Sequence, residues 1–134
     1  MSEFRYRRRV QFYETDQAGV VHFSWYLRYL EEAEHALWRA AGLSIAPPGS
    51  PVGFPRVAAT IDFHAPLHFE DEFEVLLRID AMSRRTIRYA GTIVRGETKI
   101  ASGTMTAVCV RHDPPAMTAV EIPDEIRVKL EERR

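Results

Sequence analysis

The sequence contains a single cysteine, Cys109, and no apolar run that approaches the ~18 residues of a membrane span. One cysteine excludes an internal disulfide framework, and its position in an apolar stretch predicts a buried structural thiol. The N-terminal residues lack the apolar core of a signal peptide. We therefore expect a cytoplasmic protein without a membrane span.

An excess of charge of either sign is also missing. The 18 Lys and Arg residues almost balance the 19 Asp and Glu residues, which gives a formal net charge of -1. This balance provides no electrostatic reason to expect nucleic acid or an anionic membrane as a partner. A basic cluster near the N-terminus lies mainly on the polar side of an alternating segment, without interleaved aromatic residues to stack bases (Arg5, Arg7, Arg8 and Arg9). We interpret this cluster as a solvated strand face.

Internal repeats and low-complexity segments are absent too. The chain has 134 residues, of which 46% are hydrophobic, and this is enough to build one core. We therefore predict a single domain that covers residues 1–134.

The hydrophobic period, in contrast, is well marked and changes along the chain. Residues 4–12 mostly alternate between apolar and polar side chains, which predicts a half-buried strand. Apolar residues from 23 to 41 recur at three- and four-residue spacing, which predicts a helix of about five turns ending at Gly42. The Pro- and Gly-rich residues 46–51 then predict a loop.

The two-residue period returns after this loop. It predicts three strands and a fifth candidate of mixed pattern, at residues 57–63, 73–79, 87–93 and 99–111. The links between the later strands are too short for parallel crossovers, so we predict antiparallel pairing. A short helix is expected at residues 124–132. This order predicts an α+β hotdog fold, in which an antiparallel sheet of about five strands wraps around one long central helix.

Asp16 is the most interesting ionisable residue, because it lies in a Gly-containing turn just before the predicted helix. Free backbone N–H groups at a helix start can hold a developing oxyanion, and a carboxylate can attack a carbonyl or activate a water. Gly19 would let the backbone turn tightly and approach a ligand. By spacing alone, however, Asp-x-x-Gly before a helix is more typical of a turn with an N-terminal cap.

The run from residue 10 to residue 23, continued through Tyr26 to Glu31, resembles the signature of the 4-hydroxybenzoyl-CoA thioesterase family and its YbgC-like acyl-CoA thioesterases. Residues 64–71 and 82–86 resemble the second-strand ending of that family and its turn near CoA. The resemblance implies hydrolysis of an acyl-CoA to the free acid and CoA, with no metal or redox cofactor. It also implies a homo-oligomer, either a dimer or a tetramer of paired dimers, with sites at the subunit boundary.

Carried over by position, the resemblance implies that Asp16 is the catalytic aspartate. It also implies that the backbone N–H of Phe23 polarises the thioester carbonyl, with the helix start at Val21 to Phe23 supplying the oxyanion donors. This chain has Phe23 where relatives have histidine or tyrosine, and Phe12 where the family has tyrosine. His22 lies one residue earlier and is a secondary candidate, because adjacent helical residues point about 100° apart.

Glu31 and Glu34 are candidates for a second carboxylate that orients water. Glu31 matches an acidic position of many relatives, whereas Glu34 projects closer to the centre of the apolar helix face. The alternative is that both pair in solvent with Arg28, His35 or Arg39 on the same helix.

Arg84 and Arg85 fall in a tight turn between two predicted strands, and guanidinium groups bind phosphate through paired hydrogen bonds. The resemblance implies that these arginines meet CoA, in the site of the neighbouring subunit if the sites lie between subunits; solvated turn arginines are the alternative. Thr86 could contact the pantetheine arm or simply begin the next strand. His64 and His68 would lie ~13 Å apart in a strand, so we expect no metal site.

Two other functions remain open. A non-catalytic acyl-CoA-binding module would keep the fold and the arginines, and the phenylalanines at positions 12 and 23, in place of the family's side chains, keep this alternative open. A hotdog hydratase or dehydratase would need a histidine and an acid poised at the acyl chain. Asp16 ahead of Gly19, in place of a catalytic histidine, argues against the hydratase.

Overall fold

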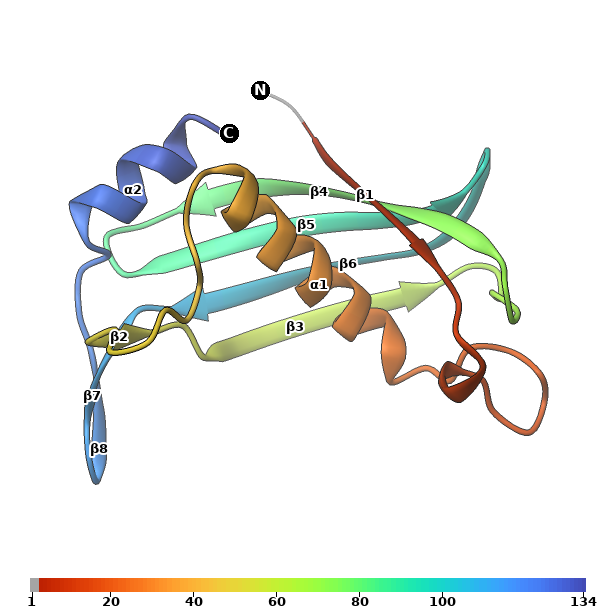
Figure 1. Ribbon diagram of the computed structural model, residues 1–134, viewed down its shortest axis with the longest axis horizontal. Helices are drawn as coiled ribbons and strands as arrows, with labels where there is room; N and C mark the ends of the chain where they lie inside the picture. Colours follow the sequence, from red (N-terminus) through yellow and green to blue (C-terminus); the bar gives the residue numbers. More distant parts are fainter. Residues whose placement is uncertain (1–2) are drawn as a thin grey trace.

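The computed structural model describes residues 3–134, which form eight strands, two α-helices and one short 3-10 helix, η1 (Phe12–Glu14). The other elements follow in the order β1 (Phe4–Arg9), α1 (Trp25–Ala40), β2 (Val52–Gly53), β3 (Arg56–Phe63), β4 (Glu72–Met82), β5 (Thr86–Arg95), β6 (Thr98–Val108), β7 (Val110–Asp113), β8 (Ala116–Ala119) and α2 (Asp124–Glu131). Figure 1 shows α1 crossing one face of the main sheet, with α2 near one end of that sheet. In residues 3–134 no helix has both the length and the apolar character needed to cross a membrane.

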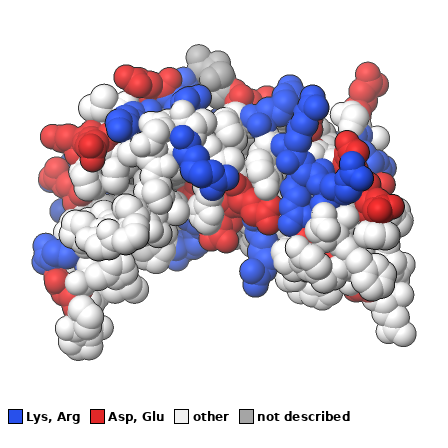
Figure 2. Space-filling model, viewed as in Figure 1, with Lys and Arg blue, Asp and Glu red and all other residues white. Residues whose placement is uncertain are grey.

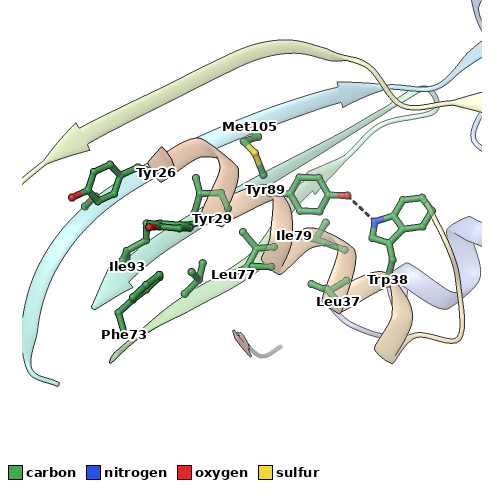
Figure 3. Close-up of a cluster of buried hydrophobic side chains, with 14 of the residues drawn as sticks. Tyr26, Tyr29, Leu37, Trp38, Phe73, Leu77, Ile79, Tyr89, Ile93 and Met105 are labelled. Atoms are coloured by element: carbon green, nitrogen blue, oxygen red, sulfur yellow. Dashed lines mark hydrogen bonds between the residues drawn. The ribbon is translucent and has the colours of Figure 1, made fainter. Parts of the chain in front are cut away.

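The main sheet has five antiparallel strands in the order β1-β4-β5-β6-β3. Alternate residues of its central strands are buried against α1, as the two-residue period predicts (Phe73, Val75, Leu77, Ile79, Ile87, Tyr89 and Ile93). The helix contributes one buried face to the same core (Tyr26, Tyr29, Leu30, Ala33, Leu37 and Trp38). Figure 3 shows helix side chains such as Tyr29 and Leu37 meeting sheet side chains such as Phe73 and Leu77. The predicted α+β architecture with an antiparallel sheet is therefore confirmed.

The predicted strand at residues 99–111 is corrected by the structure, which divides it into β6 and β7. The strand breaks at the buried Cys109, whose N–H donates to the Arg85 carbonyl at 2.7 Å. Beyond this break, β7 leaves the main sheet and pairs with β2 and β8 in a separate three-stranded sheet. Periodicity reports which residues are apolar and does not report which strand each one pairs with, so this change of sheet was not predicted.

Two element boundaries near the N-terminus also differ from the prediction. β1 ends at Arg9 and not near residue 12, because residues 12–14 form η1, whose first turn is closed by the Gln11 N–H donating to the Glu14 side chain at 2.9 Å. α1 begins at Trp25 and not at Phe23, because a turn precedes it, in which the Trp25 N–H donates to the His22 carbonyl at 3.0 Å. The closing helix lies where the sequence predicts it.

Candidate active site

Asp16 opens a tight loop between η1 and α1. Its N–H donates to the Val20 carbonyl at 2.9 Å, and its own carbonyl accepts the Gly19 N–H at 2.9 Å. Oδ1 of the carboxylate accepts the Ala18 N–H at 2.9 Å, and within residues 3–134 no donor approaches Oδ2. Gly19 has a φ of 83°, a left-handed conformation that glycine adopts without steric cost. The loop thus presents an exposed carboxylate with one oxygen free.

The residues on either side of this loop pair as the two arms of a hairpin. Thr15 forms an antiparallel bridge with Val21, and the His22 N–H donates to the Glu14 carbonyl at 2.9 Å. The pairing holds Asp16 at the tip of one arm while the other arm leads to Phe23, just ahead of α1. The aspartate is therefore fixed by main-chain hydrogen bonds on both sides of the loop.

The backbone donors predicted for an oxyanion are only partly free. The Val21 N–H donates to the Leu67 carbonyl at 2.8 Å, and the His22 N–H is already bonded to Glu14. Within the described part of the chain, the Phe23 N–H has no acceptor, and Phe23 is 66% exposed. The structure therefore narrows the predicted donor set from Val21 to Phe23 down to the Phe23 N–H, and this donor sits in the turn before the helix.

Tyr26 lies near Asp16, although no role in the site was predicted for it. Its ring is 4% exposed and packs edge-on against Phe63 of β3, with centroids 5.2 Å apart. Burial raises the pKa of Tyr26, the Leu67 backbone opposes this, and the nearby charge of Asp16 raises the pKa further. Tyr26 thus contacts Phe63 and lies within reach of the Asp16 charge, and the signal that could have found Tyr26 was its place within the family-like run.

His22 is engaged locally and does not point a free Nδ1 at the loop. Its Nδ1 lies 2.9 Å from Ser24 Oγ and accepts the Ser24 N–H at 3.2 Å. The imidazole also packs against the Phe23 ring, with centroids 4.6 Å apart. These contacts support the turn that precedes α1.

Glu31 and Glu34 lie further along α1 and have different surroundings. Glu31 is exposed, and one of its carboxylate oxygens lies 3.5 Å from Arg56. Glu34 is fully buried and accepts two hydrogen bonds from Arg56, so a solvent pairing for Glu34 is wrong. A groove of about 320 Å³ separates this part of α1 from β3, lined by Leu27, Arg28, Glu31, Arg56, Ala59 and Met105. The structure brings Glu31 to this groove.

Glu14 is a buried carboxylate that the sequence analysis missed. It has no exposed surface and is bonded to Arg8 of β1 and Tyr29 of α1. The available signal was Arg8, the one residue that breaks the alternation of the first strand. The other three N-terminal arginines pair with Glu72 and Glu74 on the outer side of β1, as a solvated strand face predicts.

Arg84 and Arg85 lie in the β4–β5 turn at the far end of the sheet, and Thr86 is the first residue of β5. Arg84 is exposed and contacts Glu121 at 2.6 Å, and the Thr86 hydroxyl bonds to Ser83. The Asp16 loop lies near the start of β4, since Val20 forms a bridge with His68. The eleven residues of β4 span about 35 Å, and Figure 1 shows the two regions at opposite ends. A single subunit therefore does not bring these residues to Asp16.

The remaining ionisable side chains offer no evident metal site. His64 contacts Ser102 at 3.3 Å and His68 lies 3.7 Å from Asp71, so the two histidines have separate partners. Within residues 3–134, no group of three His, Cys, Asp or Glu side chains is placed to hold a metal ion.

The arrangement of fold and loop has close counterparts among known proteins. The family model described as the thioesterase-like superfamily matches residues 10–130. The chain belongs to the thioesterase-like superfamily. A protein of Aquifex aeolicus, provisionally named an esterase, is 34% identical over 125 residues, covering 92% of this chain and 94% of the relative.

Two named thioesterases of this family show the same likeness. The Escherichia coli O6:H1 acyl-CoA thioester hydrolase YbgC is 29% identical over 125 residues, covering 92% of each chain. The crystal structure of a 1,4-dihydroxy-2-naphthoyl-CoA thioesterase from Synechocystis has a TM-score of 0.89 and 28% identity, covering 97% of this chain and 96% of that one. The family resemblance seen in the sequence and the thioester-hydrolase class are therefore confirmed.

Proposed function

We propose that this superfamily member hydrolyses an acyl-CoA thioester to a carboxylic acid and CoA. The observation that carries the proposal is the exposed Asp16 carboxylate, which keeps one oxygen free in a loop fixed on both sides by main-chain bonds. The Phe23 N–H follows on the adjacent arm and has a free hydrogen within the described residues. A carboxylate and an oxyanion donor on one rigid hairpin are the two groups that thioester hydrolysis requires.

The Asp16 carboxylate can act in either of two balanced ways. As a general base, it takes a proton from water while the water oxygen bonds to the thioester carbonyl carbon and the C–S bond breaks. As a nucleophile, it bonds to that carbon and expels the CoA thiolate, and water then cleaves the resulting anhydride. In both routes the thiolate ends as a thiol, and the Phe23 N–H stabilises the charge that develops on the carbonyl oxygen. These groups require neither a metal nor a redox cofactor.

The groove between α1 and β3 is the place we propose for the acyl group. Its apolar lining includes Leu27, which follows Tyr26 on the helix, and Met105 of β6. Glu31 lies at the polar side of the groove, where it can accept a hydrogen bond from an acyl hydroxyl. This placement favours acyl recognition over the water-orienting role for Glu31. It suits a hydroxylated aromatic acyl group, the class after which the Synechocystis relative is named.

The two edges of the main sheet support the expected homo-oligomer. β1 carries arginines on its outer side, and charge discourages strand pairing at an edge. β3 instead exposes apolar side chains, with Val57 at 62% and Phe63 at 50% exposure. We propose that β3 pairs with its copy about a two-fold axis. The oligomer would bring the Arg84 and Arg85 turn of one subunit to the Asp16 site of another, where the guanidinium groups would meet the CoA phosphates.

Thiol release from a panel of acyl-CoAs tests the proposed hydrolysis. The wild-type protein should release CoA from hydroxylated aromatic acyl-CoAs faster than from aliphatic ones. Tight binding of these esters without release would support a non-catalytic acyl-CoA-binding module. Addition of water to an unsaturated acyl-CoA, with the thioester intact, would instead indicate a hydratase.

A further inference from the structure

Among residues 3–134, Glu14 and Glu34 are the two fully buried carboxylates. Glu14 lies two residues before Asp16. Its Oε1 accepts hydrogen bonds from Arg8 at 2.8 Å, from the Gln11 N–H at 2.9 Å and from the Tyr29 hydroxyl at 2.8 Å. Its Oε2 accepts a second hydrogen bond from Arg8. The carboxylate is therefore fixed from three different segments of the chain.

Arg8 extends this cluster to α1 by a second route. Its side chain is 13% exposed, and it also donates to Glu32, with Nε 2.9 Å from Oε1. The guanidinium lies over the Tyr29 ring, with its central carbon 5.0 Å from the ring centroid. Glu32 in turn accepts the Tyr6 hydroxyl at 3.0 Å. The first strand and the central helix are thus joined around Glu14.

The main chain of Glu14 holds the opposite arm of the hairpin. Its carbonyl accepts the His22 N–H at 2.9 Å, and the next residue is Phe23. Glu14 is therefore two residues from Asp16 along the chain, and its carbonyl is hydrogen-bonded to the segment that carries the Phe23 donor. A movement of Glu14 would move the carboxylate and the oxyanion donor together, relative to α1.

A gain in folding stability does not by itself explain why this cluster is buried. Burying a charge requires partners that recover its lost hydration, and well-packed apolar residues in place of a buried ion pair are often as stabilising or more so. Burial opposes ionisation of Glu14, yet the hydrogen bonds from Arg8, the Gln11 N–H and Tyr29 hold its pKa below the ordinary value. The group is thus charged at neutral pH, and its charge fixes a specific geometry.

We infer that Arg8, Glu14 and Tyr29 form a positioning unit that sets the place of Asp16 and of the Phe23 N–H against the bound thioester. This inference rests on the proposed hydrolysis. The three residues do not touch the substrate, and they act through the loop. A misplacement of about 1 Å in reacting groups can lower a rate by about 10²-fold, so loss of the unit should lower kcat with little effect on KM.

A matched pair of tyrosines provides the test. Tyr29 and Tyr89 are both fully buried; the Tyr29 hydroxyl donates to Glu14, and the Tyr89 hydroxyl accepts from Trp38 Nε1. Figure 3 shows the Tyr89 to Trp38 bond at the other end of the cluster from Tyr26. Tyr29→Phe should lower kcat by about tenfold or more and leave KM nearly unchanged. Tyr89→Phe should lower Tm about as much as Tyr29→Phe does, and it should keep the wild-type kcat.

Glu14→Gln is the stronger variant, with an expected loss in kcat of about 10²-fold. If it fails to fold, Tyr29→Phe and Arg8→Lys still decide the question. Equal kcat values for Tyr29→Phe and Tyr89→Phe, measured below both Tm values, would overturn the inference. Failure of the proposed function has a different signature: the wild type would release no thiol from any acyl-CoA, or Asp16→Asn would keep the wild-type kcat. Loss of activity in Asp16→Asn with full kcat in the Glu14 and Tyr29 variants would overturn the positioning unit alone.

Discussion

The Tyr29 hydroxyl on the central helix donates a hydrogen bond to the Glu14 carboxylate at 2.8 Å, two residues before the exposed Asp16. This contact connects the core of the molecule with its candidate chemical group. Asp16 itself has an Asx-type bond to the Ala18 N–H and no contact with a basic side chain in the described residues. The rigidity of the site therefore comes from Glu14 and Tyr29, next to the Asp16 loop, and not from contacts of the Asp16 side chain with basic groups.

The Glu14 cluster should make stability depend on pH in the acid range. Burial opposes the charge of Glu14, but hydrogen bonds from Arg8, the Gln11 N–H and Tyr29 place its folded-state pKa below the ordinary value of 4.5. The stabilisation is therefore fully present above pH 4.5 and is lost as the pH falls through the folded-state pKa. Glu32 also accepts a hydrogen bond from Arg8, and it is unchanged in the Glu14→Gln variant that is compared with the wild type.

Thermal unfolding of the wild type and Glu14→Gln across pH 3 to 7 checks this prediction. The Tm difference between the two should be largest near neutral pH and should shrink at the acid end. A difference that stays constant over the whole range would contradict a charged, stabilising Glu14.

The Phe23 N–H is expected to be the oxyanion donor, and two substitutions separate the backbone from the side chain. Phe23→Ala keeps the N–H and removes a ring that is 66% exposed, so kcat should be largely retained. Phe23→Pro removes the donor and should lower kcat by about 10²–10³-fold. Circular dichroism establishes that α1 remains intact in the proline variant, and equal kcat values for the two variants would exclude this donor.

Gly19 is expected to be required by its backbone conformation alone. Its φ is 83°, and a Cβ placed there would meet no atom within 4 Å. Gly19→Ala should therefore destabilise the protein by about 1–2 kcal/mol through strain. Gly19→Asn should cost less, because asparagine tolerates the left-handed region. Chemical denaturation gives both values, and the reverse order would point to a steric role.

The turn arginines are expected to bind the nucleotide part of CoA. Arg84→Ala and Arg85→Ala should each raise the KM for an acyl-CoA by about tenfold, since a charge-assisted hydrogen bond contributes about 1.5–3 kcal/mol. Hydrolysis of the matching acyl-pantetheine, which lacks the nucleotide phosphates, should be unchanged. An equal effect on both substrates would mean that the arginines act through the turn and not through phosphate.

Much of this architecture could be predicted because it depends on short-range pattern. The alternation in β4 and β5 and the three- and four-residue spacing of α1 mark which face of each element is buried. Antiparallel pairing followed from the short links between strands. The change of sheet at Cys109 could not be predicted, because it depends on which strands lie alongside β7 in space.

The candidate site shows the same division. Asp16 and Gly19 were predicted from a turn ahead of a helix together with the family-like run. Glu14 was missed because its partners come from positions 8, 11 and 29, and only the fold brings these together. The placement of Glu31 in the groove also depends on Arg56, which lies on another element.

In the proposed oligomer, the site would combine residues of two subunits. Figure 2, in the same view as Figure 1, shows the molecule hollowed along one edge, between two largely uncharged lobes. Charged side chains gather between these lobes. The arginine turn and the Asp16 loop lie at opposite ends of the sheet, and only an assembly of subunits could bring them together. No sequence period reports such an arrangement.

The measurement that tests the central claim most directly is the kcat of Asp16→Asn, with the Kd of the same acyl-CoA measured alongside. The substitution keeps the size of the side chain and its acceptor for the Ala18 N–H, and it removes the charge that serves as base or nucleophile. The account predicts a fall in kcat of about 10²–10⁴-fold with a Kd close to that of the wild type. A kcat equal to the wild-type value would contradict it.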